Sequence, residues 1–471
     1  IQSFRDRAPN LKREKLNLHS GTSAGVLKLP ACQPGTLYSV ADRNITKALS
    51  YADFRWLWVG SLGSSFAMNM QIIARGWLVY TLTSSALDLA WVTLSFMLPT
   101  VAFSLLGGVI ADRMPKKVII TSAQTLNCLA TVIMGIIIIT GRVSFWDFIW
   151  FGFFNGSVLA LSMPARQAFV PELIPERLIF TAMALNTTSW NLSRILGPAL
   201  AGFLIAWVAG GDTSSTYGVG IVYFMIAALY GISAITMLMV RKRGVSEQAS
   251  EQKSALTDMA DGLRYVWANP PVFGLILLSI VPFLFGMPLN TLLPAFNEDI
   301  LGGGPEDLGI LMSAMGMGAI GGSLMLAWIG EIRHKAAWLI GTCVAWGVFT
   351  SLFGLAVAVP VAAVMVAFIG FISAWNMSLN RGLLQMQVVH HMRGRIMSID
   401  MMSHGLMPLG VIPISLIAEA YDVAVALVCA GIAFGVAVLL LAAFSRSVRH
   451  VDAEMPPIEN PDDGEAVGEA R

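Results

Sequence analysis

The stretch GGVIADRMPKK, residues 107–117, places four charged side chains, Asp112, Arg113, Lys116 and Lys117, between two long apolar runs. The chain of 471 residues is 56% hydrophobic and only 13% charged, whereas a soluble domain carries about 25% charged residues. This composition leaves too little polar surface for contact with water. We therefore expect an all-α integral membrane protein, in which this stretch forms a short polar turn between two spanning helices.

Working outward from this turn, we find apolar segments that are long enough to cross a bilayer. A spanning helix needs about 20 mostly apolar residues, because lipid offers the backbone no hydrogen-bond partner. The twelve predicted spans are residues 54–80, 88–111, 117–140, 145–165, 179–207, 218–240, 271–296, 306–330, 336–357, 360–381, 394–419 and 421–445.

Lys and Arg residues are concentrated in alternate loops, and such an excess marks the cytoplasmic side. The loops on the same side as GGVIADRMPKK hold fifteen Lys and Arg residues, against one, Arg142, in the opposite loops. The fifteen are Arg113, Lys116, Lys117, Arg166, Arg177, Arg241, Lys242, Arg243, Lys253, Arg264, Arg333, Lys335, Arg381, Arg393 and Arg395. We therefore expect a multi-pass protein of the cell inner (cytoplasmic) membrane with both termini in the cytoplasm.

Polar segments divide the chain further. Residues 1–50 are basic and residues 446–471 are acidic, and both are predicted to be disordered cytoplasmic tails. Six spans in residues 51–240 precede the longest internal polar stretch, and six in residues 270–445 follow it. Within this cytoplasmic linker, residues 241–269, we expect an amphipathic helix at residues 255–267 on the membrane surface, which ends before a Pro-Pro pair.

The two halves resemble each other. Arg166 closes an even-numbered span and Pro198 lies 32 residues later, inside the next span; Arg381 and Pro413 repeat this arrangement at the same separation. A Gly-Gly pair at 107–108 also has a counterpart at 321–322. Repeated halves are typical of transporters that rock around a central site.

Asp112 needs a partner at the membrane edge. Arg166 is one candidate, and the start of the eleventh span near Gly394 is another, since a helix N-terminus carries a partial positive charge. The cytoplasmic orientation of the loop is sufficient to account for Lys116 and Lys117. It does not account for Asp112, because acids contribute little to orientation.

Several stretches resemble one transporter family. GGVIADRMPKK resembles the loop signature of the major facilitator superfamily. Its secretion-effector branch, which includes the enterobactin exporter and macrolide efflux proteins, is similar to ARGWLVYTLTSSAL (74–87), MPARQAFVPELIP (163–175), ALNTTSWNLSRILGPALAG (184–202), GLRYVWANP (262–270) and RGRIMS (393–398). The resemblance covers about residues 50–445. It implies two pseudo-symmetric bundles of six transmembrane helices.

The resemblance also implies a cytoplasmic latch, in which the loop Asp and its Arg partner hold the two halves together in the outward-facing state. The implied latch residues are Gly108, Asp112, Arg113, Arg166, Glu331, Arg381 and Arg393. The second half departs from the pattern, since its loop AWIGEIRHKAA has Glu331 in place of the Asp. From the repeat, we expect a Glu331–Arg381 pair that mirrors Asp112–Arg166.

The fifth span contains SRILGPALAG (193–202), which resembles the helix 5 signature of exporters in this superfamily, although Ser193 replaces its first Gly. Pro198 removes one helical hydrogen bond, and Gly197 and Gly202 allow close contact with a neighbouring helix. A bendable, proton-tight seam is one interpretation, and ordinary helix packing is the other.

Ionisable residues inside spans are costly and usually face a cavity or a partner. Asp400 and His404 are four residues apart and should share a helix face. A carboxylate beside an imidazole in a dry cavity suits a proton carrier; a latch near the end of the span is the alternative. Candidate cavity residues are Asn69, Arg75, Asn127, Asn155, Trp190, Arg194, Asn290, Trp375 and Asn376. For Arg75 the alternative is snorkelling to the surface, and for the amides it is hydrogen bonding between helices.

These features predict a secondary active transporter, in which protons drive export of a small amphipathic molecule such as a siderophore, drug or secondary metabolite. Import of a nutrient and a non-transporting receptor or scaffold are the alternatives. We expect no enzyme, because the sequence has no GxSxG, HExxH or GxxxxGK[ST] match. The expected partners are membrane lipid, a small-molecule substrate and protons. We expect a monomer without cofactor or nucleic acid, and the spacing of the four cysteines predicts no metal site.

Overall fold

The computed structural model describes residues 45–210, 216–244, 255–329, 334–389 and 392–444, and within these ranges the chain is helical with short turns and no strand. The first half contains α2 (Ala52–Thr83), α3 (Ala86–Ala102), α4 (Ser104–Arg113), α5 (Lys116–Ile139), α6 (Phe145–Leu173), the short η1 (Glu176–Leu178), α7 (Ile179–Ala209) and α8 (Thr216–Met239). After α9 (Ala255–Ala268), the second half contains α10 (Pro270–Val281), η2 (Pro282–Gly286), α11 (Pro288–Asp299), α12 (Pro305–Ile329), α13 (Lys335–Gly354), α14 (Val359–Gln387), α15 (Arg393–Met402), η4 (Ser403–Leu406), α16 (Met407–Ala420) and α17 (Val423–Phe444).

Each predicted span coincides with one helix or with consecutive helical segments. Within the described ranges, ten segments are long and apolar enough to cross a membrane. The other two predicted spans correspond to α2 and to α3 followed by α4. The amphipathic helix predicted at residues 255–267 corresponds to α9, one residue longer.

Three of the predicted spans are interrupted by irregular turns. The second span breaks at Phe103, one turn after Pro99. The seventh contains the π-helix η2, which begins at Pro282, and the eleventh contains the 3-10 segment η4, which lies just before Pro408. Proline lacks the N–H that continues an α-helix, so irregular turns beside proline are expected.

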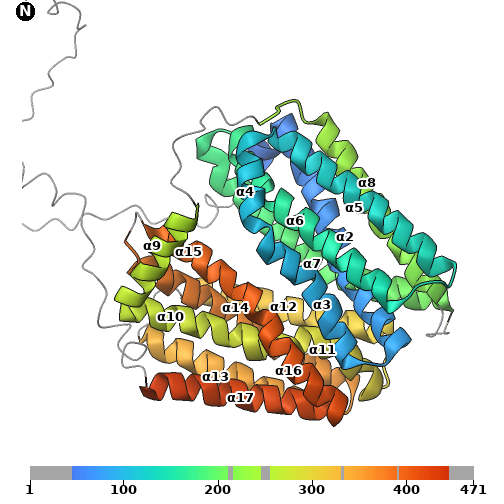
Figure 1. The fold of residues 1–471 in the computed structure, drawn as a ribbon, viewed down its shortest axis with the longest axis vertical. Helices are drawn as coiled ribbons and strands as arrows, with labels where there is room; N and C mark the ends of the chain where they lie inside the picture. Colours follow the sequence, from blue (N-terminus) through green and yellow to red (C-terminus); the bar gives the residue numbers. More distant parts are fainter. Residues whose placement is uncertain (1–44, 211–215, 245–254, 330–333, 390–391, 445–471) are drawn as a thin grey trace, which may run out of the picture. The chain divides into compact units, whose positions relative to one another are not determined.

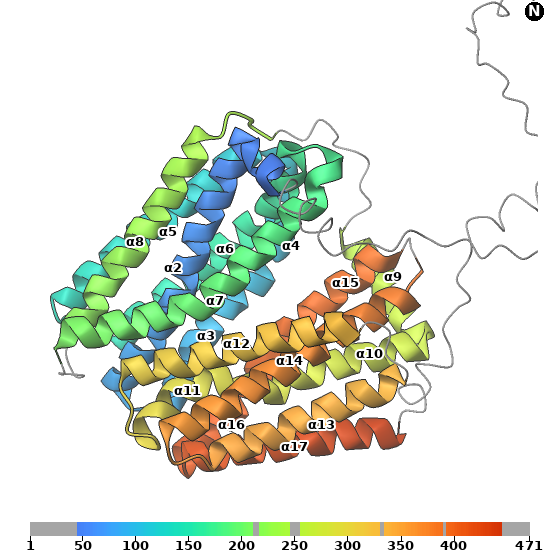
Figure 2. The same ribbon diagram turned by 180° about the vertical axis from the view of Figure 1, so that it is seen from behind.

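The two halves repeat their packing as well as their sequence. Figures 1 and 2 show α5 beside α8 in the first half and α13 beside α17 in the second. A Cβ at Gly107 would collide with the Ala160 carbonyl, so α4 packs closely on α6, and Gly322 of α12 makes the same kind of contact with the Phe371 carbonyl of α14. Close backbone approach through glycine is a common way for helices to associate in a membrane.

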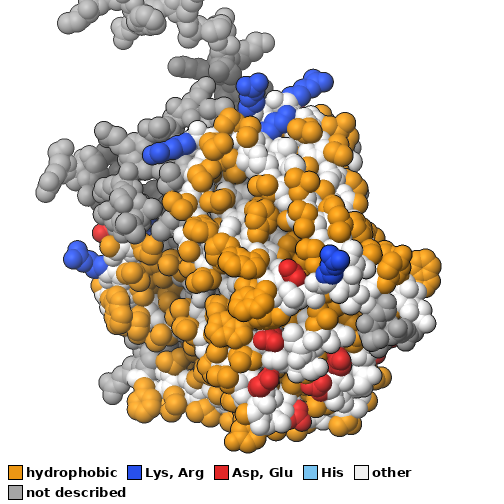
Figure 3. Space-filling view, turned by 45° about the vertical axis from the view of Figure 1, so that its right-hand side comes forward, with side chains coloured by type: hydrophobic (Ala, Val, Ile, Leu, Met, Phe, Trp, Pro, Cys, Tyr) orange, Lys and Arg blue, Asp and Glu red, His pale blue; other side chains and the backbone are white. Residues whose placement is uncertain are grey.

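The surface of the described helices is largely apolar. Large side chains such as Trp207 and Trp328 are 71% and 85% exposed. Figure 3 shows one face on which apolar side chains cover most of the surface, with Lys and Arg mainly toward the upper part and Asp and Glu mainly toward the lower. An apolar surface of this kind is stable against lipid rather than water.

Both predicted tails fall almost entirely outside the described ranges, at residues 1–44 and 445–471, as does most of the predicted linker before α9. The two ends of the helices differ in charge. We call the end at Lys116, Lys242 and Arg395 the basic end, and the end at Asp88, Asp299 and Glu419 the acidic end.

Candidate transport site

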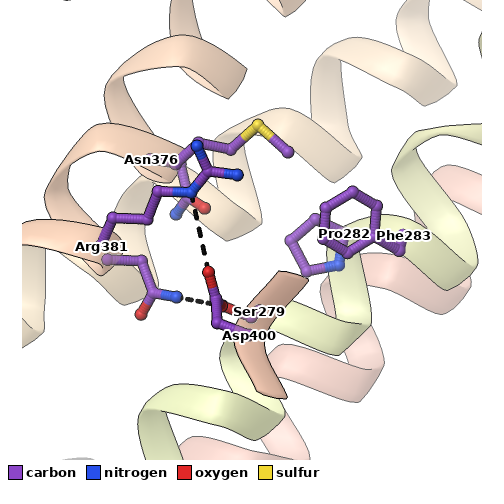
Figure 4. Close-up of a pocket in the computed structure, with 8 residues that line it drawn as sticks. Ser279, Pro282, Phe283, Asn376, Arg381 and Asp400 are labelled. Atoms are coloured by element: carbon purple, nitrogen blue, oxygen red, sulfur yellow. Dashed lines mark hydrogen bonds and ion pairs between the residues drawn. The ribbon is translucent and has the colours of Figure 1, made fainter. Parts of the chain in front are cut away.

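A buried carboxylate in the second half is the centre of a small pocket. Asp400 on α15 is 2% exposed. Its Oδ1 accepts a 2.5 Å hydrogen bond from the Ser279 hydroxyl of α10, and its Oδ2 lies 3.6 Å from Nε of Arg381 on α14. Figure 4 shows Arg381 and Ser279 both directed at the Asp400 carboxylate. Three helices therefore meet at one acid.

Further polar groups orient this carboxylate. Asn380 Nδ2 donates to the Ser279 hydroxyl, which in turn donates to Asp400, and Asn380 also donates to the Leu275 carbonyl at 3.3 Å. The pocket is lined by Ser279, Pro282, Phe283, Asn376, Met377, Asn380, Arg381 and Asp400. Chains of hydrogen bonds in an apolar surrounding hold a charged group in one position.

Local irregularity of the backbone opens this pocket. The π-helix η2 begins three residues after Ser279 and includes the pocket residues Pro282 and Phe283. The 3-10 segment η4 begins three residues after Asp400. Irregular turns inside helices are frequent at functional sites, since they displace side chains from regular helix packing.

The expected Asp400–His404 arrangement is not supported by the backbone. Because α15 ends at Met402 and His404 lies on the 3-10 segment η4, the two residues are not on one continuous α-helix. Regular α-helical spacing therefore does not apply between them, and because the His404 side chain is outside the described part of the structure, their pairing stays a prediction. The partner that the structure places beside Asp400 is Arg381.

The predicted latch residues are placed as follows. Arg166 Nη1 donates a 2.8 Å hydrogen bond to the Ser64 hydroxyl of α2. The backbone of Asp112 belongs to α4, but its side chain is not among those described, and Glu331 lies outside the described residues. Neither predicted pair, Asp112–Arg166 nor Glu331–Arg381, is therefore tested.

The remaining latch residues lie near the basic end. Arg113 is exposed, and Arg393 Nε donates to the Val388 carbonyl at 3.1 Å. A Cβ at Gly108 would have nothing within 4 Å. Of the Gly107–Gly108 pair, Gly107 therefore permits close contact with α6, whereas Gly108 faces open space.

The charged turn is bound to its own half by contacts that sequence reasoning missed. Lys116 Nζ lies 2.7 Å from Glu172 Oε1 at the end of α6. Lys117 Nζ donates to the Leu238 and Val240 carbonyls at 2.9 and 2.5 Å, at the end of α8. The affinity of lysine for helix C-termini was the available signal for Lys117; no spacing rule pointed to Glu172.

The seam predicted in the fifth span lies on α7 and contacts two other helices, α2 and α12. A Cβ at Gly197 would lie 2.9 Å from the Asn69 Cβ of α2, and one at Gly202 would collide with the Pro305 carbonyl of α12. The Ser313 hydroxyl of α12 also donates to the Ile195 carbonyl of α7 at 2.7 Å. The predicted close contacts at both glycines are therefore present, and Gly202 contacts the other half of the chain.

Polar contacts also join the two halves at the acidic end. The Tyr80 hydroxyl of α2 donates to Oδ2 of Asp299 at the end of α11. The Ser85 hydroxyl donates to Oε2 of Glu419 on α16 at 3.1 Å. Both acids lie on the second half and both hydroxyls on the first, so these bonds hold the halves together at this end.

The cavity candidates are distributed among several environments. Asn69 and Asn155 are buried and donate to the Ser65 and Phe151 carbonyls of their own helices. Buried Asn376 donates to the Leu339 carbonyl, the Thr342 hydroxyl and the Cys343 sulfur of α13.

Other candidates are less enclosed or lack polar partners. Trp375 stacks on Trp338 with ring centres 5.4 Å apart. Asn290 Nδ2 lies 3.3 Å from the Met287 sulfur. Asn127 and Arg194 are partly buried, and Trp190 is exposed. Arg75 lies on α2 with its guanidinium carbon 5.6 Å from the centre of the Phe96 ring. Asn376 is thus the one cavity candidate that also lines the Asp400 pocket.

Comparison with known proteins shows which family the chain resembles. The family model for transmembrane secretion effectors matches residues 46–465. The multidrug efflux pump Tap of Mycolicibacterium fortuitum is 24% identical over 368 residues, covering 75% of this chain and 86% of that protein. The staphyloferrin A transporter of Staphylococcus aureus is 24% identical, covering 79% and 89%. Macrolide efflux protein A of Streptococcus pyogenes is 23% identical, covering 78% and 89%.

Solved structures agree on the fold. The nucleoside transporter NupG has a TM-score of 0.66 to this chain at 14% identity, covering 83% of this chain and 98% of that one. A bacterial homolog of the human lysosomal transporter Spinster, in an inward-facing and unoccupied conformation, has a TM-score of 0.61 at 13% identity, covering 86% and 98%. The family match over most of the sequence is decisive: the chain belongs to the transmembrane secretion effectors of the major facilitator superfamily and is a multi-pass membrane transporter.

Proposed function

We propose that this transporter exports a small amphipathic molecule from the cytoplasm by alternating access. Two of the relatives described above carry efflux in their names, and the third is a siderophore transporter. A membrane protein that draws such molecules from the cytoplasm must first open toward that side. Alternating access then requires the opposite end to be closed.

The observation that carries the alternating-access part of this proposal is the closure of the acidic end, whereas the direction of transport rests on the relatives. The bonds Tyr80–Asp299 and Ser85–Glu419 join the halves there, and the Gly202–Pro305 contact extends the closed region along α7 and α12. The loop charges of the sequence place the basic end in the cytoplasm. The described conformation therefore corresponds to one in which the outer gate is closed.

Proton coupling is the second part of the proposal. Asp400 is a buried acid within a span, and its counterion Arg381 has a side chain that is 46% exposed. Protonation of the carboxylate would remove the ion pair and leave Arg381 able to contact water or substrate. A proton entering at Asp400 could thus alter contacts among α10, α14 and α15, which is what coupling requires.

Three further expectations belong to the same proposal. Both termini lie in the cytoplasm, since they follow from an even number of spans and from the basic end being inside. The chain acts as a monomer. It acts as a transporter and catalyses no covalent chemistry, in keeping with its family.

Drug and siderophore accumulation in a pump-deficient bacterial host tests export. Cells expressing the protein should accumulate less of an exported compound and tolerate higher concentrations of it than cells with empty vector. A protonophore should abolish the difference. Greater accumulation of a compound, or faster growth on a nutrient, would instead support import. Unchanged accumulation of every drug and siderophore tested, in cells with confirmed membrane expression, would contradict export.

A further inference from the structure

The first half contains two arginines inside its helices that form no ion pair with a described carboxylate. Arg75 on α2 contacts the face of Phe96, and Arg166 on α6 donates to the Ser64 hydroxyl. Among the described side chains, none forms an ion pair with either guanidinium. Both arginine residues are partly buried.

Two polar side chains of α2 and α8 have unused hydrogen-bond donors, whereas the Ser64 hydroxyl already donates to the Ser61 carbonyl at 3.1 Å. Ser64, Gln71 and Arg75 are separated by seven and four residues on α2, so they lie along one helix face. Gln71 is 7% exposed, and its Nε2 has no hydrogen-bond partner. Tyr223 on α8 is fully buried, and its hydroxyl also lacks a partner.

Tyrosines lie on the neighbouring helix α8. Tyr223 and Tyr230 both belong to this helix, which packs against α2. The polar groups therefore lie along α2, α6 and α8. We call Ser64, Gln71, Arg75, Arg166 and Tyr223 the cationic stripe.

An unpaired charge and unsatisfied donors inside a membrane protein are costly. The described carboxylates of the first half do not offset this cost, because they lie near helix ends: Asp53, Asp88, Asp147, Glu172 and Glu176. A negatively charged ligand group would satisfy both the charge and the donors. Arginine is well suited to this role, since its planar fork binds carboxylate and phosphate in a bidentate manner.

We propose that the cationic stripe is a binding subsite for an anionic group, carboxylate or phosphate, of the transported molecule. The inference rests on the proposed transport function and adds a substrate class to it. Ser64, which binds Arg166, and Arg75 are eleven residues apart, about 16 Å along α2. A substrate with two separated anionic groups therefore contacts both arginines, and one with a single group contacts Arg75 or Arg166. Asp400 lies in the second half, so the substrate anion and the proton-responsive acid belong to different bundles.

Binding of carboxyfluorescein, a small amphipathic anion, to the purified full-length protein in an uncharged detergent tests the subsite by fluorescence polarisation. Wild type should bind the dye saturably. Arg75→Gln and Arg166→Gln should each weaken binding by roughly tenfold, and Arg75→Lys should lose less because it keeps the charge. Arg142→Gln removes an exposed arginine from a loop and is the matched control.

The variant Tyr223→Phe tests whether loss of carboxyfluorescein binding could result from misfolding alone. It removes a hydroxyl that has no hydrogen-bond partner, so it leaves no native bond broken, and it should weaken carboxyfluorescein binding by about threefold. Binding of the cationic dye ethidium should not decrease in any of these variants.

Absence of saturable carboxyfluorescein binding to wild type would overturn the subsite, and so would unchanged affinity in Arg75→Gln and Arg166→Gln. Equal losses for both dyes would also overturn it, because they would indicate a general structural effect. These measurements need neither a gradient nor a membrane. Failure of export in cells would therefore contradict the proposed function without affecting an arginine-dependent binding result.

Discussion

Asp400 on α15 and Ser279 on α10 are joined by a hydrogen bond of 2.5 Å, which the serine hydroxyl donates to the carboxylate. On its other oxygen the same carboxylate faces Arg381 at 3.6 Å. The acid therefore has one neutral partner and one charged partner. Under the proposed coupling, loss of the negative charge would remove the attraction to Arg381 and leave an oxygen that still accepts from Ser279, so the change would fall on the contact between α14 and α15.

Replacing Asp400 by asparagine should flatten the pH dependence of transport in proteoliposomes. The amide keeps an oxygen for Ser279 but cannot titrate and cannot pair with Arg381. The measurement is initial transport rate against pH under a fixed gradient. Glu306→Gln, which removes an exposed acid at the start of α12, is the control and should keep the wild-type profile.

Full gradient-driven transport by Asp400→Asn with an unchanged pH profile would mean that Asp400 is structural. Arg381→Gln offers an independent check, because it removes only the charged partner. It should alter the pH profile while Ser279 still bonds to the carboxylate. An Arg381→Gln profile that matches wild type would remove the ion pair from the mechanism.

Asp112→Asn should impair transport while the protein remains folded in the membrane. The change removes a charge from the turn after α4 without altering side-chain volume. Transport by membrane vesicles and elution of the purified variant as a single species measure the two effects. Wild-type transport at normal expression would rule out a latch that depends on this charge.

Much of the architecture could be predicted because lipid imposes a simple requirement on length and apolarity. The twelve predicted ranges recur as helices or consecutive helical segments, and α9 begins at the predicted residue. The breaks at Phe103, η2 and η4 could not be located from hydropathy, since they do not change how apolar a segment is. Proline near each break was a signal that an irregular turn was possible.

The candidate site was less predictable, because its partners come from different helices. Asp400 could be recognised as an acid inside a span, but Ser279 and Arg381 precede it by 121 and 19 residues, and nothing local connects them. His404 was chosen by regular helical spacing, which fails where α15 changes to a 3-10 segment. Contacts such as Lys116–Glu172 require the three-dimensional arrangement of α5 and α6.

Lys116 and Glu172 should show measurable coupling in a double-mutant cycle. The lysine side chain is 5% exposed and the glutamate 35%, so the pair is partly shielded from solvent. We expect an interaction of roughly 0.5–3 kcal/mol between Lys116→Gln and Glu172→Gln in thermal or denaturant unfolding. Strictly additive effects of the two substitutions would show that the pair contributes nothing to stability.

Gly202→Ala should hinder closure of the acidic end and slow transport. The added Cβ would collide with the Pro305 carbonyl, so α7 and α12 must separate. Overpacking of this kind costs about 1–3 kcal/mol. Gly341→Ala is the matched control, because it has nothing within 4 Å and the substitution favours helix. Equal transport by both variants in vesicles would contradict a role for this contact in the cycle.

The orientation of the helices can be tested with two exposed arginines at opposite ends. Arg142 lies in the turn between α5 and α6, and Arg177 lies in η1 between α6 and α7. Because the loop charges predict that the Arg177 side is cytoplasmic, a cysteine at Arg142 should react with an impermeant thiol reagent added to intact cells. A cysteine at Arg177 should react only after the membrane is opened. Both substitutions belong in a background without the native cysteines, since Cys429 is itself exposed.

Labelling of Arg177→Cys alone in intact cells would show that the orientation is the reverse of the predicted one. It would also place the closed acidic end in the cytoplasm, so that substrate from inside the cell would meet a closed gate.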